Sequence, residues 1–143
     1  MNKILISKKK NKFKINKSKK VKNSKLRKGG ELINSGGFGC VFKPALKCKG
    51  SKTRKPNYIS KLGSTKNMNE EFNNFKLVKK LLSQVPNSKK YFLLEMQKCR
   101  PSKLSKNDMK NLENCTILDK YNINSTNKYN INKYLDKFEI LNI

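Results

Sequence analysis

The chain has 143 residues, with 35 Lys+Arg against 9 Asp+Glu, a net charge of +26 and no histidine. This length accommodates one small domain with extensions. Because histidine is absent, sites that need imidazole as a base or as a nucleophile activator are excluded, the Ser-His-Asp triad among them. The chemistry open to the chain therefore depends on lysine, carboxylates, thiols and the backbone.

Half of the net charge lies in the first fifth of the chain. Residues 1–28 contain 13 Lys+Arg and no acid, whereas residues 106–143 contain 6 Lys+Arg and 5 acids. A like-charged block repels itself and buries little apolar surface, so we predict a disordered basic arm over 1–28. Such an arm makes nucleic acid a candidate partner, although A/T-rich codon usage would explain the lysine excess equally well.

The sequence predicts neither a membrane segment nor a metal site. Its longest apolar runs are about four residues, far too short to span a bilayer, and the start MNKILISKKK lacks the apolar centre of a secretory signal. We therefore expect a cytoplasmic protein, or a nuclear one if the basic arm acts as a nuclear localisation signal. The cysteines, at positions 40, 48, 99 and 115, form no C-x-x-C pair and no histidine could complete a zinc shell, so we expect no metal site. Without a secretory signal, reduced thiols are expected.

The first folded segment is predicted to be strand-rich. Residues 31–33 and 40–42 are short β-type runs, and a glycine-rich turn over 34–39 separates them. Residues 47–57 are rich in Lys, Gly, Ser and Pro and indicate an exposed loop before a strand over 58–62.

The main helix is predicted over 69–85, with Asn69 as its N-cap and Pro86 ending it. Spacings of four, three and four place four side chains on one face, namely Glu71, Phe75, Val78 and Leu82. If this face meets the sheet, the Glu71 carboxylate needs a cationic partner, and Lys61 on the preceding strand is the closest candidate in sequence.

The remaining chain carries weaker patterns. Residues 91–96 are predicted as a buried strand, and Ser105 with Asp108 has capping-box spacing before a short helix. The pentamer Lys-Tyr-Asn-Ile-Asn occurs twice after residue 119, which is typical of a low-complexity tail. Apolar residues near the end either line a docking helix or belong to a disordered tail.

Taken alone, the run Ser35-Gly36-Gly37-Phe38-Gly39 predicts only a tight hairpin. No Gly-Lys-Ser/Thr follows it, as a phosphate-binding loop before a helix would require, and it leads into a strand. The remaining functional interpretation is a glycine hairpin laid over a ligand, where backbone N–H groups approach phosphate oxygens and Phe38 shields them from water.

Three segments follow one another here: the run from Leu32 to Phe42, then Ile59-Ser60-Lys61-Leu62, and then a glutamate-bearing helix followed by an apolar strand. Together they resemble the N-terminal lobe of eukaryotic-like protein kinases. The variant Gly-Gly-Phe-Gly-Cys-Val-Phe-Lys-Pro, with Pro-Asn and Tyr-Phe after the helix, is similar to serine/threonine kinases of large cytoplasmic DNA viruses. The resemblance implies an α+β fold with a twisted antiparallel sheet and one main helix.

The resemblance also implies an ATP-binding site. In this family the glycine loop covers the ATP phosphates, a strand lysine holds them, and a helix glutamate pairs with that lysine. By position the lysine is Lys61 and the glutamate is Glu71, with Glu70 as the second choice. The implied cofactor-binding residues are Ile33, Gly36, Gly37, Phe38, Gly39, Val41, Lys61 and Glu71.

The sequence also departs from the family pattern. Asn34 replaces the first loop glycine, Ile59 replaces a small alanine beside the adenine, and no His-Arg-Asp or Asp-Phe-Gly motif is present. The resemblance thus implies a truncated, pseudokinase-like protein that binds ATP weakly or docks on a protein partner, without a metal and without autonomous phosphotransfer. The predicted domains are a basic arm over 1–28, a kinase-lobe-like domain over 29–105, and a short helix and Asn/Lys/Ile-rich tail over 106–143.

Overall fold

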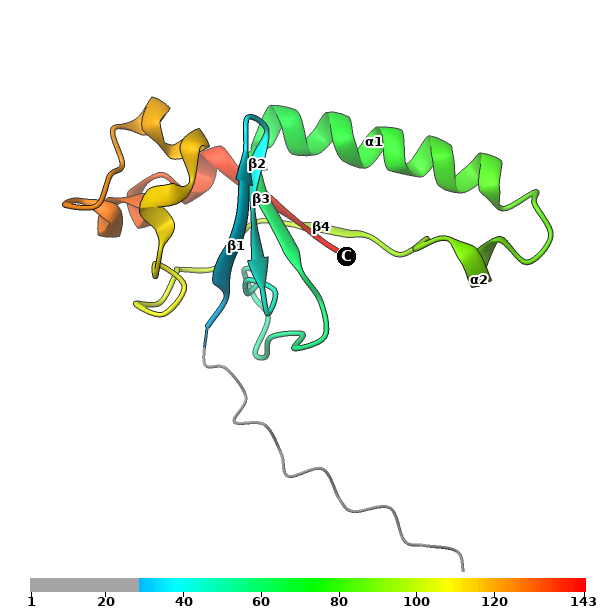
Figure 1. The fold of residues 1–143 in the computed structure, drawn as a ribbon, viewed down its shortest axis with the longest axis horizontal. Coiled ribbons are helices and arrows are strands. Elements are labelled where there is room, and N and C mark those ends of the chain that lie inside the picture. The colour runs from blue at the N-terminus through cyan, green and yellow to red at the C-terminus, as the bar shows by residue number, and fades with distance from the viewer. Residues whose placement is uncertain (1–28) are drawn as a thin grey trace, which may run out of the picture.

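The computed structural model describes residues 29–143, and the basic arm predicted over 1–28 lies outside them. The described chain is an α+β fold with a five-stranded antiparallel sheet and one main helix (Figure 1). In chain order its elements are β1 (Glu31–Gly36), β2 (Gly39–Lys43), β3 (Ser60–Ser64), α1 (Thr65–Leu82), α2 (Ser88–Tyr91), β4 (Gln97–Cys99), the 3₁₀ helices η1 (Leu112–Asn114), η2 (Thr116–Tyr121), η3 (Lys128–Lys133) and η4 (Leu135–Lys137), and β5 (Phe138–Asn142).

The strand order is β1-β2-β3-β5-β4, and every neighbouring pair is antiparallel. The three strands predicted around the glycine turn are confirmed, although β3 begins at Ser60 and continues to Ser64. The hairpin forms as expected, since Gly36 pairs with Gly39 across a two-residue turn.

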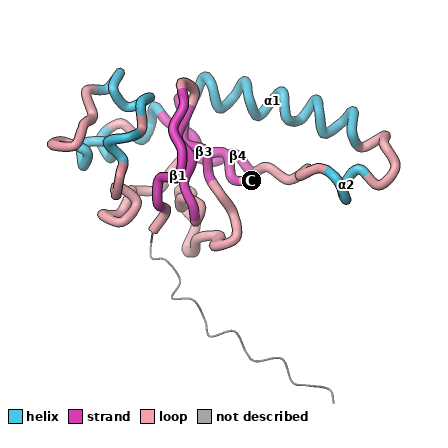
Figure 2. The backbone as a smooth tube through the Cα atoms, in the orientation of Figure 1, coloured by secondary structure: helices cyan, strands magenta, loops and turns pink. Residues whose placement is uncertain are grey.

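The predicted C-terminal tail is wrong, because its last residues form a strand inside the sheet. Strand β5 lies between β3 and β4, with Lys61 opposite Leu141 and Cys99 opposite Ile140. Between β4 and β5 the chain forms loops broken by short helical turns, as Figure 2 shows. The pentamer repeat therefore belongs to a packed layer, with Ile123 and Ile131 both buried.

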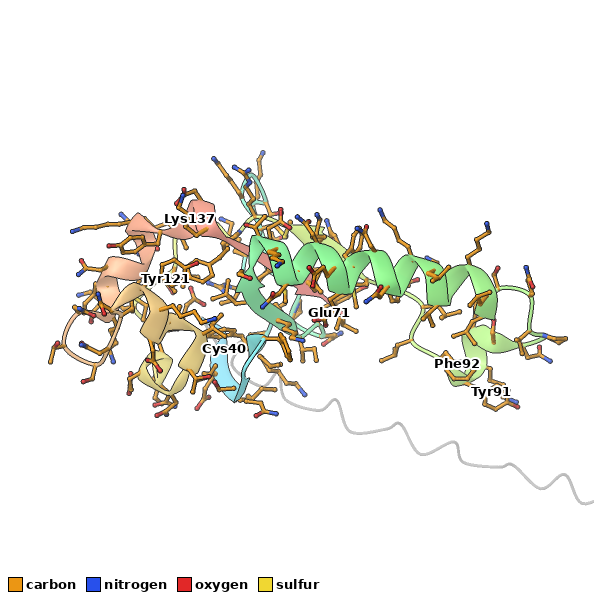
Figure 3. The ribbon with its side chains drawn as sticks, turned by 90° about the horizontal axis from the view of Figure 1, so that it is seen from above. Cys40, Glu71, Tyr91, Phe92, Tyr121 and Lys137 are labelled. Carbon is orange, nitrogen blue, oxygen red and sulfur yellow. A yellow bond between two sulfur atoms is a disulfide. The ribbon has the colours of Figure 1, made fainter. Side chains whose placement is uncertain are left out.

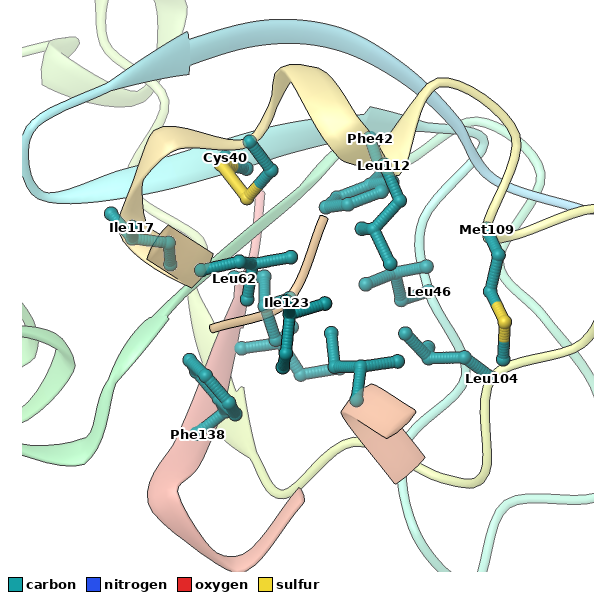
Figure 4. Packing of buried hydrophobic residues seen from close by; sticks show 14 of the residues in the cluster. Cys40, Phe42, Leu46, Leu62, Leu104, Met109, Leu112, Ile117, Ile123 and Phe138 are labelled. Atoms are coloured by element: carbon teal, nitrogen blue, oxygen red, sulfur yellow. A yellow bond between two sulfur atoms is a disulfide. The ribbon is translucent and has the colours of Figure 1, made fainter. Parts of the chain in front are cut away.

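That layer covers one face of the sheet and forms the core with it (Figure 4). Alternation along the strands directs Phe42, Leu62 and Ile140 to this face, and all three are fully buried. We call the segment that contains η1 to η4, residues 112–137, the 3₁₀ layer. Its apolar residues, Leu112 and Leu118 among them, pack against these strand residues in the same cluster. We call this side of the sheet the closed face.

The expectation of reduced thiols is wrong for this structure, because all four cysteines form disulfides. Cys40 pairs with Cys115 and Cys48 pairs with Cys99, each with a Cα–Cα distance of 5.7 Å. Neither bond has a local signature in the sequence, since 75 and 51 residues separate the partners. The first disulfide links β2 to the start of η2 and so ties the 3₁₀ layer to the sheet.

Helix α1 begins earlier than predicted and presents a different side to the sheet. Its N-cap is Ser64, whose side chain accepts a hydrogen bond from the Asn67 N–H, so Asn69 is not the cap. The side facing the sheet includes Met68, which is fully buried, and the half-buried Phe72 and Phe75. The predicted stripe is therefore wrong in part: Val78 is 48% exposed.

Two smaller predictions also need correction. Residues 91–96 are not a buried strand, because Leu93 is 82% exposed and the chain reaches strand geometry only at Gln97. Ser105 and Asp108 do exchange capping-box hydrogen bonds, but a series of turns and η1 follow them rather than an α-helix. Within residues 29–143, no helix is long and apolar enough to cross a membrane.

Candidate functional site

The candidate site lies on the face of the sheet opposite the 3₁₀ layer, which we call the open face. It begins at the β1–β2 hairpin, where a Cβ atom added to Gly36 or Gly37 would meet no other atom within 4 Å. At Gly39 a Cβ atom would lie 2.7 Å from the Leu62 carbonyl oxygen and 3.1 Å from Lys61 Cε. Glycine at position 39 therefore gives the Lys61 side chain room to lie against the hairpin.

Lys61 occupies the middle of the sheet. It lies on β3, opposite Val41 of β2 on one side and Leu141 of β5 on the other. Its Nζ donates a hydrogen bond of 2.6 Å to Glu71 Oε2 on α1. The exposed fractions are 26% for the Lys61 side chain and 34% for that of Glu71, so solvent reaches both.

This ion pair was predicted, but the structure supplies a different reason for it. We expected Glu71 to lie on the helix face that is buried on the sheet, in line with Phe75, Val78 and Leu82. The buried side instead includes Met68 and Phe72, and Glu71 lies at its flank, three residues from Met68 and next to Phe72. The carboxylate therefore reaches Lys61 from the edge of the helix–sheet contact.

A second polar group lies nearby on the open face and was missed by sequence reasoning. Lys98 of β4 is opposite Leu141, its Nζ is 3.2 Å from Glu139 Oε2, and it also contacts Asn69 Oδ1 of α1. Phe72 lies with its ring centroid 5.6 Å from the Lys98 ammonium. No local pattern predicts this group, because it depends on β5 lying between β3 and β4.

The structure brings only some of the predicted site residues together. Gly39, Val41, Lys61 and Glu71 form one continuous group, by strand register and by the contacts given above. Ile33 lies at a bulge of β1 and is 55% exposed, and Phe38 at the hairpin tip is 69% exposed. Glu70, the second choice for the pair, is exposed on α1.

The 3₁₀ layer holds the hairpin from the other side. Ser35 Oγ accepts a hydrogen bond of 3.1 Å from the Thr116 N–H. Cys115, the residue before Thr116, forms a disulfide with Cys40, which is labelled in Figure 3. The hairpin is therefore attached to the layer at two adjacent points. Thr116 Oγ1 also donates a hydrogen bond of 3.5 Å to the Gly36 carbonyl oxygen, whereas the positions of Cβ atoms at Gly36 and Gly37 are open.

Asp108 forms a separate charged cluster at the start of β1. Its buried carboxylate accepts hydrogen bonds from the Gly30 N–H at 2.8 Å and from Arg54 at 2.6 Å. Burial alone raises the pKa of Asp108, but the hydrogen bonds from Arg54, Ser105 and Gly30 outweigh it and hold the pKa below its ordinary value. Because both its oxygens have partners, we interpret this cluster as structural.

The candidate site offers one ammonium group and the backbone N–H groups of a glycine turn. These donors suit the phosphate groups of a nucleotide, for which lysine is a common point-charge partner. Among residues 29–143, no three His, Cys, Asp or Glu side chains lie close enough to hold a metal ion. Comparison with family models, with curated proteins and with solved structures finds no match to this chain.

Proposed function

We propose that the chain is a protein-kinase-like nucleotide-binding module whose glycine hairpin and Lys61 hold the phosphates of ATP. The observation that carries the proposal is the 2.6 Å pair between Lys61 on β3 and Glu71 on the helix that follows. Protein kinases use a β3 lysine paired with a helix glutamate to place the lysine against the nucleotide phosphates. This chain carries the same two residue types on the corresponding elements.

The donor set of the open face fits a phosphate chain. Glu71 fixes the position of Lys61, yet about a quarter of the Lys61 side chain is exposed. Its ammonium group can therefore donate a hydrogen bond to a phosphate oxygen while it remains bonded to the Glu71 carboxylate. Gly36 and Gly37 leave open space above the turn, where backbone N–H groups can approach an anion. Bound ATP would supply negative charge to this group, and Val41 would offer an apolar contact to the adenine.

We further propose that binding occurs without phosphate transfer by the chain alone. Kinase chemistry needs an aspartate that positions the substrate hydroxyl and further groups that hold magnesium. The sequence contains neither the His-Arg-Asp nor the Asp-Phe-Gly motif that supplies them. We therefore expect no radiolabel transfer from ATP to the chain or to generic substrates, and transfer that disappears in Lys61→Ala would contradict this part of the proposal.

Fluorescence titration with a methylanthraniloyl derivative of ATP tests nucleotide binding. Lys61→Ala is expected to weaken binding at least tenfold, because it removes the ammonium group that lies against the glycine hairpin. Lys128→Ala is the matched control, since Lys128 forms a comparable half-exposed ion pair with Glu113 in the 3₁₀ layer, at 3.2 Å. Equal affinity in the wild type and both variants would overturn the proposed site.

A second candidate function rests on the charge of residues 1–28, which hold 13 Lys+Arg and no acid. We propose that this segment binds nucleic acid without sequence preference, through phosphate neutralisation and counterion release. Binding of the full chain to a DNA duplex should then fall steeply between about 50 and 200 mM salt. Removal of residues 1–28 should abolish most of it, and equal binding by the shortened chain would exclude the segment as the site.

A further inference from the structure

The far half of α1 and the chain after it form an apolar surface away from the candidate nucleotide site. Here α1 extends past the edge of the sheet, and α2 with the segment after it lies beneath the helix (Figure 1). A hollow of about 750 Å³ lies between them and reaches the ends of β3 and β5. We call it the distal hollow, and its apolar lining residues are Tyr58, Ile59, Phe92, Leu93, Leu94 and Ile143.

Two of the apolar residues that line the distal hollow are exposed, whereas Leu94 is buried. Leu93 is 82% exposed and Phe92 is 49% exposed, and Tyr91 beside them is 70% exposed. Figure 3 labels Tyr91 and Phe92 below the far end of α1. Large apolar side chains gathered in one concave place are a common mark of a binding surface, whereas scattered ones are not. The closed face shows that this chain can bury such residues when a covering segment is present.

Lysines outnumber acids in the segments that form the distal hollow, and its charged lining residues are Lys79, Lys89 and Glu95. Residues 72–94 contain five lysines and no acid, and two of these lysines, Lys79 and Lys89, line the hollow itself. Within residues 29–143, Glu95 is the one acidic side chain that lines the hollow. A partner that fits must therefore combine apolar side chains for the hollow with carboxylates for its rim.

This charge decides among possible occupants. A second copy of the chain, with a net charge of +26, and its own basic segment 1–28 would both bring positive charge to the lysines. A lipid surface offers negative charge but is broad and flat, whereas the distal hollow is concave and takes projecting side chains. We propose that the distal hollow binds an acidic amphipathic segment of a partner protein, independently of any nucleotide.

Selection from a displayed library of random peptides of about 15 residues, long enough to form a helix, tests this proposal with the full chain as target. Selected peptides are expected to combine Leu, Phe or Trp with Asp or Glu at helical spacing. Their affinity should fall at least tenfold for Leu93→Ser and severalfold for the charge reversal Lys79→Glu with Lys89→Glu. The matched control is Tyr129→Ser, which removes a 56% exposed aromatic side chain from η3 and should leave affinity unchanged.

Other outcomes would overturn the proposal. These are a failure to enrich any peptide, selected peptides without acidic residues, or equal loss of binding in Leu93→Ser and Tyr129→Ser. Binding of wild-type chain to phosphatidylserine vesicles that Leu93→Ser abolishes would assign the surface to lipid instead. Concentration-dependent dimerisation that the same variant abolishes would assign it to a second copy.

Because Leu93 is mostly exposed, its replacement should not unfold the chain, and circular dichroism verifies this.

Discussion

The two faces of the sheet differ in how completely they are covered. On the closed face, Phe42, Leu62 and Ile140 are fully buried by the 3₁₀ layer, and a disulfide fastens that layer to β2. On the open face, α1 buries Met68 but leaves the Lys61–Glu71 pair within reach of solvent. Both faces use the same five strands, so the difference comes from what packs on them.

This contrast separates stability from binding within one small domain. Most of the buried apolar side chains lie on the closed face, where burial contributes roughly 25 cal/mol for each Å² of apolar surface removed from water, although Met68 and Leu141 are fully buried on the open face. The open face leaves charged groups and a glycine turn accessible to solvent, and it buries less apolar surface than the closed face. Substitutions of buried residues on the closed face should therefore change the free energy of unfolding, and those of solvent-exposed residues on the open face should mainly change binding.

The largest expected effect on the free energy of unfolding comes from a substitution on the closed face. Phe42→Ala should lower the free energy of unfolding by about 4 kcal/mol, because it removes a fully buried ring and leaves a cavity. Leu77→Ala on α1, at a side chain that is 59% exposed, should cost less than about 0.5 kcal/mol. Urea unfolding followed by circular dichroism measures both, and equal costs would remove the distinction between the faces.

Loss of the disulfide between Cys40 and Cys115 should have the second largest effect on the free energy of unfolding. Replacing both cysteines with alanine is expected to lower the free energy of unfolding by about 3 kcal/mol, since the bond closes a long loop in the unfolded chain. A thiol assay of the denatured, unreduced wild type should detect no free thiol, because all four cysteines are paired. Four reactive thiols, with unchanged stability after reduction, would contradict the prediction.

Asp108→Asn should lower the free energy of unfolding by about 2 kcal/mol at neutral pH, because it weakens buried charge-assisted hydrogen bonds to Arg54 and Gly30. The folded-state pKa of Asp108 lies below its unfolded value, so its stabilising contribution is complete above about pH 5 and is lost as the pH falls through the folded pKa. Acid titration of unfolding should show this loss in the wild type and a smaller one in the variant. Identical pH profiles would contradict it.

The smallest effect on stability should come from the pair at the candidate site. Lys61→Met and Glu71→Gln are each expected to change the free energy of unfolding by less than about 1 kcal/mol, because solvent screens a half-exposed ion pair. Lys128→Met, in a pair of similar exposure, is the control. A loss of several kcal/mol in Lys61→Met alone would mean that this lysine is a structural residue rather than a binding one.

Local patterns in the sequence were enough to predict the elements around the glycine turn. The turn residues Gly36 and Gly39 and the alternating runs beside them define β1 and β2 without distant contacts. The pairing of Lys61 with Glu71 could also be predicted, because both residues lie within two successive elements. The exact helix face could not, since it depends on where α1 crosses the sheet.

Features that depend on distant parts of the chain were not predictable. β5 pairs with β3 across more than 70 residues, and its sequence near Ile140 has no signal that distinguishes it from a short helix. The 3₁₀ turns between β4 and β5 lack a long apolar period, so the segment looked like a low-complexity tail. The disulfides follow from the same distant contacts.

The position of β5 has a consequence for folding kinetics. As the chain emerges from the ribosome, β3 and β4 are complete about forty residues before Phe138–Asn142 exists to join them. Until then β3 keeps an unpaired edge of hydrogen-bonding groups, which can pair with another chain. Closing so long a loop is slow, so the nascent protein passes through an interval in which it is prone to aggregate.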